Sequence, residues 1–96
     1  MTPENIINQL SSLKQQAKQK YNAELKAVFG SAVAGRFKNS SDIDILVKFS
    51  PEADLFNFVG LSQFLEEHLS RKVDVVPVDS LRKELRAAIL RQAVDL

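Results

Sequence analysis

Two aspartates, Asp42 and Asp44, stand two positions apart at the start of an apolar run that ends at residue 49. Alternate side chains of a β-strand point to the same face, so these carboxylates would lie side by side while Ile43 and Ile45 face a core. Two carboxylates this close repel each other unless a divalent cation neutralises them. The pattern therefore predicts a site that holds Mg²⁺ against phosphate.

A glycine and a serine, Gly30 and Ser31, end the apolar segment that precedes the two aspartates. Glycine lets a phosphate group approach the backbone closely, and the free N–H groups at the start of a helix favour anions. We therefore expect Gly30 and Ser31 to hold phosphate oxygens next to the metal.

A third aspartate, Asp74, lies between Val73 and Val75 in a later apolar segment. The two valines would point into the core and Asp74 away from it, so Asp74 joins the first pair if the two strands are neighbours. Three carboxylates around two metal ions fit the two-metal scheme for in-line displacement at phosphorus. In that scheme Asp42 and Asp44 bridge both metals, and Asp74 binds only the metal on the attacking oxygen.

The apolar spacing predicts the elements that position these residues. Strands are expected over residues 25–29, 43–49 and 73–78, and helices over residues 3–21, 31–34 and 55–69, the last one capped by Asp54. A final helix would follow Ser80 as its cap, with five apolar side chains facing inward: Leu81, Leu85, Ala88, Ile89 and Ala93. Residues 1–96 are thus expected to form one α/β domain, a small mixed sheet of about three strands flanked by helices.

The composition excludes several classes of protein. The chain has no cysteine, which rules out a disulfide framework, a thiolate zinc site and cysteine catalysis. Its net charge of +1 indicates no partner by itself. No apolar run approaches the ~20 residues of a membrane span, and the polar beginning argues against a signal peptide, so we expect a cytoplasmic protein without membrane contact.

The combination of Gly30-Ser31, Asp42-Ile43-Asp44 and an isolated later Asp74 resembles the DNA polymerase β-type nucleotidyltransferase superfamily, and most closely its minimal members, the MNT proteins. The resemblance implies the polymerase β-like nucleotidyltransferase fold. It also implies Mg²⁺-dependent transfer of a nucleoside monophosphate, AMP from ATP, to an acceptor hydroxyl with release of pyrophosphate. Gly30 and Ser31 would hold the triphosphate, and the three aspartates would hold two Mg²⁺ ions.

The resemblance also implies a partner and contains one departure. Minimal members are commonly antitoxins paired with a HEPN-domain toxin, and some AMPylate a tyrosine of that toxin. A chain of 96 residues has no room for a second domain that grips the acceptor, so another protein or a second copy of this chain must hold it. Many relatives carry an arginine where this chain has Ala34, and Arg36 and Lys38 are the candidate substitutes for binding the phosphates.

Two other functions remain open on the sequence. The chain would be a binding module if it neutralised a toxin by complex formation alone, a role that does not require three aspartates held together. It would be a nucleic-acid-binding domain if its late basic residues formed the contact surface: Arg82, Lys83, Arg86 and Arg91. That cluster lacks interleaved aromatic residues and a known motif, which makes nucleic acid the weaker alternative.

Overall fold

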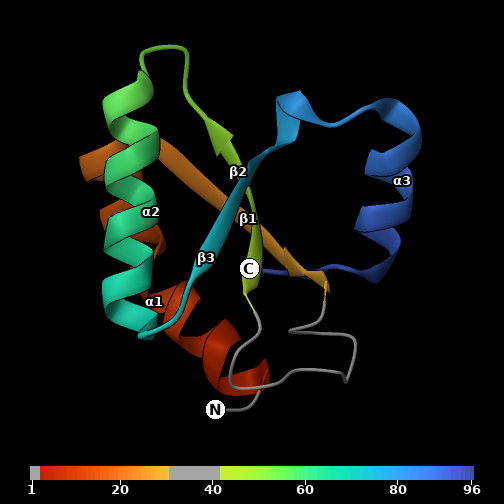
Figure 1. Cartoon of the computed structure of the whole chain (residues 1–96), viewed down its shortest axis with the longest axis horizontal. Helices are drawn as coiled ribbons and strands as arrows, with labels where there is room; N and C mark the ends of the chain where they lie inside the picture. Colours follow the sequence, from red (N-terminus) through yellow and green to blue (C-terminus); the bar gives the residue numbers. More distant parts are fainter. Residues whose placement is uncertain (1–2, 31–41) are drawn as a thin grey trace.

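The computed structural model describes residues 3–30 and 42–96 of the chain (Figure 1). In chain order the elements are α1 (Pro3–Tyr21), β1 (Ala23–Phe29), β2 (Ile43–Phe49), α2 (Leu55–Leu69), β3 (Val73–Pro77), the 3₁₀ turn η2 (Val78–Ser80), α3 (Lys83–Gln92) and β4 (Val94–Asp95). No helix within these ranges is long and apolar enough to cross a bilayer.

The strands form one mixed sheet in the order β3-β2-β1-β4. The pair β2/β3 is parallel, whereas β1 pairs antiparallel with both β2 and β4. The mixed sheet was predicted, but it has four strands rather than three. The additional strand, β4, pairs Val94 with Val28 and Asp95 with Ala27, and a two-residue strand is too short to produce an alternating pattern in the sequence.

One face of the sheet carries the hydrophobic core, and Figure 1 shows α1 and α2 on that side. The buried side chains come from both helices and from the inward positions of three strands: Ile6, Leu10, Leu13, Ala17, Ala23, Leu25, Val28, Ile43, Ile45, Val47, Leu61, Phe64, Leu65, Leu69, Val73 and Val75. This apolar burial is the main stabilising contribution to the fold. It fixes Asp42, Asp44 and Asp74 on the opposite face, because these residues alternate with the core positions.

A β-bulge at Lys26 interrupts the pairing of β1 with β2. Leu25 pairs with Val47 and Ala27 pairs with Leu46, so Lys26 is an extra residue with no pairing partner on β2. After the bulge, Val28 faces the core and Phe29 faces the opposite side, where it pairs with Asp44. The bulge therefore decides which side chains of β1 lie beside the carboxylates.

The helix α2 begins as the sequence predicts. The Asp54 carboxylate accepts a hydrogen bond from the Asn57 backbone N–H at 2.9 Å, and the Asn57 side chain accepts one from the Asp54 N–H at 3.0 Å. These reciprocal bonds satisfy backbone N–H groups that a helix start leaves without partners. The capping box fixes where α2 starts relative to the end of β2.

The prediction for the last helix was wrong in two respects. Ser80 does not cap it: α3 starts at Lys83 without a side-chain cap, and the Ser80 hydroxyl donates to the Pro77 carbonyl at 2.8 Å. None of the five side chains expected to face inward is buried, and Leu85 is 55% exposed. The helix lies on the side of the sheet away from α1 and α2 (Figure 1), where only a few apolar groups are available to bury it.

Candidate active site

Strand pairing brings two of the candidate carboxylates together. In the parallel pair β2/β3, Asp44 lies opposite Asp74, and neighbouring strands are about 4.8 Å apart. Asp42 precedes Asp44 by two positions at the entrance to β2. Asp44 is half-buried, whereas Asp42 and Asp74 are exposed. The three carboxyl groups thus share the open face of the sheet, with Asp44 between the other two.

The electrostatics of this face are unfavourable for three ionised groups. Burial raises the pKa of the Asp44 carboxyl, and the negative charges of Asp74 and Asp42 and a hydrogen bond with Asp74 raise it further. Burial and like charge both disfavour the ionised form. The arrangement therefore stores charge repulsion that a bound cation would relieve.

Gly30 follows the last residue of β1, and its backbone lies against the Asp44 carboxylate. Its φ is +78°, a backbone conformation that side chains with a Cβ rarely adopt. A Cβ at this position would overlap Asp44 Oδ2 and lie 3.2 Å from Asp44 Cγ. Glycine is thus required here both for the turn and for the close approach of the backbone to the carboxylate.

Glu66 is a positioning residue that the sequence analysis missed. Its Oε2 accepts a hydrogen bond from the Val73 backbone N–H at 3.1 Å, next to Asp74 on β3. The Ile43 N–H donates to the Lys72 carbonyl at 3.0 Å and ties the start of β2 to the same point. These bonds hold the two carboxylate-bearing strands in register. Nothing in the sequence distinguishes Glu66 from its exposed neighbour Glu67.

The donor set fits Mg²⁺. Carboxylate oxygens are hard ligands, which suit Mg²⁺ rather than zinc or copper. Within residues 3–30 and 42–96, no three carboxylate, imidazole or thiol side chains close around a common point. Mg²⁺ usually keeps several waters and binds through one or two carboxylates together with substrate phosphates. An open carboxylate face is therefore suited to a metal that is shared with a nucleotide.

Three other predicted site residues, Ser31, Arg36 and Lys38, lie outside the described residues. The same is true of the helical turns expected over residues 31–34. Their roles stay predictions.

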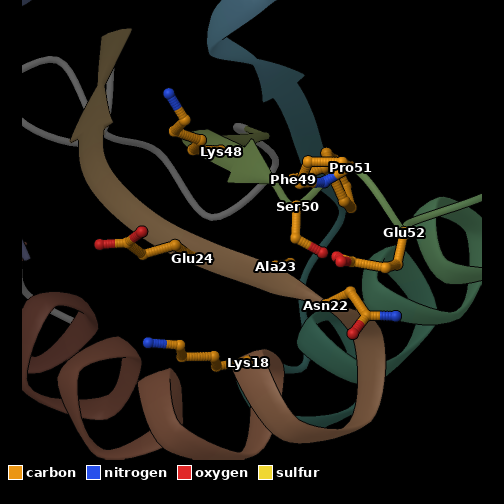
Figure 2. Close-up of a pocket in the computed structure, with 9 residues that line it drawn as sticks. All are labelled: Lys18, Asn22, Ala23, Glu24, Lys48, Phe49, Ser50, Pro51 and Glu52. Carbon is orange, nitrogen blue, oxygen red and sulfur yellow. The ribbon is translucent and has the colours of Figure 1, made fainter.

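A pocket of about 430 Å³ opens at the other end of β1 and β2, away from the carboxylates. Figure 2 shows its lining, with Lys18 from α1, Glu24 from β1 and Lys48 from β2 around the opening. Lysine and glutamate side chains alternate here, and none of the three aspartates contributes to it. This pocket is therefore separate from the candidate active site.

Comparison with known proteins places the chain in a family. The model of the nucleotidyltransferase domain family matches residues 10–96. The protein adenylyltransferase MntA of Thermococcus cleftensis is 35% identical over 94 residues, which cover 98% of this chain and 95% of MntA. The chain belongs to the nucleotidyltransferase domain family, as the sequence resemblance predicted, and it is a nucleotidyltransferase.

Two solved structures are similar to the whole fold. One, described as a candidate minimal nucleotidyltransferase, is 30% identical with a TM-score of 0.84 and matches 100% of this chain and 97% of its own. The other is a toxin–antitoxin complex with AMP-PNP, of which one chain is 27% identical with a TM-score of 0.73 over 92% of this chain and 69% of that one. Both confirm the predicted nucleotidyltransferase fold.

Proposed function

We propose that this nucleotidyltransferase transfers AMP from ATP, with Mg²⁺, to a hydroxyl group of a HEPN-type toxin and acts as its antitoxin in the cytoplasm. The observation that carries the proposal is the pairing of Asp44 with Asp74 on an open face, with the Gly30 backbone against the Asp44 carboxylate. The MntA relative is named for protein adenylylation, and a similar fold occurs in a toxin–antitoxin complex with an ATP analogue.

Each residue has a defined task in this proposal. Asp42, Asp44 and Asp74 would hold two Mg²⁺ ions, which neutralise the triphosphate and activate the acceptor hydroxyl when bound. The Gly30 turn would let the β- and γ-phosphates approach the backbone, with Ser31 beside it. The acceptor oxygen bonds to the α-phosphorus, the bond to the β-phosphate oxygen breaks, and pyrophosphate leaves. Asp74 would receive the hydroxyl proton and pass it to water.

Intact-mass spectrometry of the partner protein tests the proposal. The toxin encoded beside this gene would be incubated with MgATP and either the wild-type chain or the Asp42→Asn/Asp44→Asn variant. We expect the toxin to gain one or more AMP masses with the wild type only. An unchanged mass in a stable complex would contradict the transferase and favour the alternative, a binding module that neutralises the toxin without chemistry.

A further inference from the structure

A groove of about 510 Å³ runs along the carboxylate face between the sheet and α3. Ala27 and Leu46 lie on the outer face of the sheet and form its floor, and Leu90 of α3 forms part of one wall. Leu46 is two positions beyond Asp44, so both side chains point to this face of β2. The groove is therefore a direct continuation of the candidate active site.

The direction of the groove matters for the reaction. Gly30 lies beside Asp44 at one end of β2, and the groove begins two residues beyond Asp44, at Leu46, and extends to Lys48 at the other end. In an in-line displacement the attacking and leaving oxygens lie on opposite sides of the phosphorus. With pyrophosphate leaving at the Gly30 end, the acceptor hydroxyl must come from the side on which the groove lies.

Lysine and carboxylate side chains meet at the far end of the groove. Lys26, Lys48 and Asp95 line it; Lys26 is ion-paired with Glu24 at 2.8 Å, and Lys48 is exposed. A hydrogen bond and the charge of Lys26 lower the pKa of the adjacent Glu24, and the charges of Lys18 and Lys14 lower it further. Glu24 offsets the charge of Lys26, so Lys48 is the cation of this end that can meet an acidic group. Lys48 also borders the pocket of Figure 2, so it lies at the edge between the groove and that pocket.

We propose that this groove binds the acceptor polypeptide: an apolar segment that places its hydroxyl residue at Asp74 and an acidic side chain at Lys48. The proposal rests on the transferase function proposed above. Lys48 is four residues from Asp44, which is about 13 Å along a strand. In an extended acceptor, the acidic group would therefore lie about four residues from the modified hydroxyl. Opposite charges at that distance fix the direction in which the segment binds.

Steady-state AMP transfer to the partner toxin tests the groove with two variants on different elements, Lys48→Glu and Leu90→Glu. Both residues are exposed, so the fold should tolerate them, which a melting curve would check. Each variant should raise the KM for the toxin about tenfold and leave the KM for ATP unchanged, because only the docked segment meets the new carboxylate. Lys20→Glu, an exposed charge reversal outside the groove, should change neither value.

Three results would overturn the groove assignment. A raised KM for ATP alone would mean that the nucleoside occupies the groove. If a variant eluted at a different volume from the wild type in the absence of the toxin, a second copy of this chain would cover the groove. Unchanged values for both substrates would mean that the acceptor binds elsewhere. A wild-type chain that transfers no AMP at all would instead refute the proposed function.

Discussion

The two faces of the sheet differ in what they bury. The face under α1 and α2 contains the hydrophobic core, and Ile43, Ile45 and Val47 of β2 are fully buried there. The other face carries three aspartates, and its helix, α3, has no buried residue. Charged groups that must meet a metal and a substrate cannot be covered by apolar side chains without a large desolvation cost. The fold is therefore stabilised from one face, which leaves the other available for chemistry.

The largest effect is expected from Asp44→Asn on the carboxylate face. The substitution removes a metal ligand and the charge stabilisation that the metals supply, several kcal/mol, so kcat/KM for AMP transfer should fall about 10³-fold or more. Steady-state kinetics would measure this, with Asp79→Asn, an exposed aspartate in η2, as the control. Retention of activity within tenfold would contradict the assignment of Asp44.

A pair of leucine truncations compares the two faces directly. Leu65 of α2 is fully buried in the core, whereas Leu90 of α3 is 50% exposed. Leu65→Ala should lower the free energy of unfolding by about 2–5 kcal/mol because it leaves a cavity in a packed core. Leu90→Ala should cost less than about 1 kcal/mol. Urea denaturation would measure both, and equal losses would show that α3 is as important to stability as the core.

Gly30→Ala should affect both stability and activity. The new Cβ would be strained at φ +78° and would displace the Asp44 carboxylate. Such backbone strain costs about 1–3 kcal/mol. Transfer should also fall, by about tenfold or more, since small misplacements of reacting groups reduce rates strongly.

The matched control for Gly30 is Gly60→Ala in α2. Its Cβ would meet the Tyr21 ring at 2.8 Å, on the core side of the sheet. This variant should lose stability but keep its activity at temperatures well below its melting point. If Gly30→Ala behaved in the same way, the contact with Asp44 would have no role in transfer.

Glu66→Ala should have a smaller effect on transfer. It removes the acceptor for the Val73 N–H and loosens the strand that carries Asp74. Residues that orient metal ligands typically contribute 10–100-fold, so we expect about tenfold here. Glu66→Gln keeps an acceptor oxygen and should retain most activity, and Glu67→Ala should be neutral. Equal losses in the Ala and Gln variants would point to a charge effect instead of positioning.

The smallest effect is expected on the stability of the metal-free protein and on the way this stability depends on pH. Burial and the neighbouring carboxylates raise the pKa of Asp44 in the folded state, so its ionised form destabilises the fold. The wild type should therefore lose stability relative to Asp44→Asn as pH rises through the unfolded and then the folded pKa. At pH 7 in EDTA the variant should be more stable by less than about 1 kcal/mol, since the site is open to solvent.

Chemical denaturation from about pH 3 to pH 7 would follow this difference across the carboxyl range. The two proteins should converge in stability at the acidic end, where Asp44 is protonated. A difference that stayed constant over the whole range would show that repulsion at Asp44 is not its cause.

The sequence predicted those parts of the fold that depend on local patterns. The alternation around Asp44 and Asp74, the cap at Asp54 and the glycine at position 30 all follow from short-range geometry. The pairing of β2 with β3 brings Asp44 and Asp74 together, but the alternating pattern alone does not show that these two strands are neighbours. The family resemblance, carried by the same residues, was confirmed by the match over residues 10–96.

The parts that could not be predicted depend on tertiary contacts. The bulge at Lys26 comes directly before an unbroken apolar run, Ala27 to Phe29, and this run gives no sign that the register shifts. The strand β4 has two residues and exists only because β1 lies beside it. The spacing of the apolar residues predicts the helix α3, but it does not show that these residues remain unburied where the helix meets the sheet.

The measurement that tests the central claim most directly is transfer from ATP labelled with ³²P at either the α- or the γ-position. The purified chain, Mg²⁺ and the partner toxin would be incubated with each label, and the toxin would then be resolved from free nucleotide. We predict that the toxin acquires the α-label and not the γ-label, and that Asp44→Asn abolishes the labelling. Labelling from the γ-position, or α-labelling that survives in Asp44→Asn, would contradict nucleotidyl transfer at the carboxylate face.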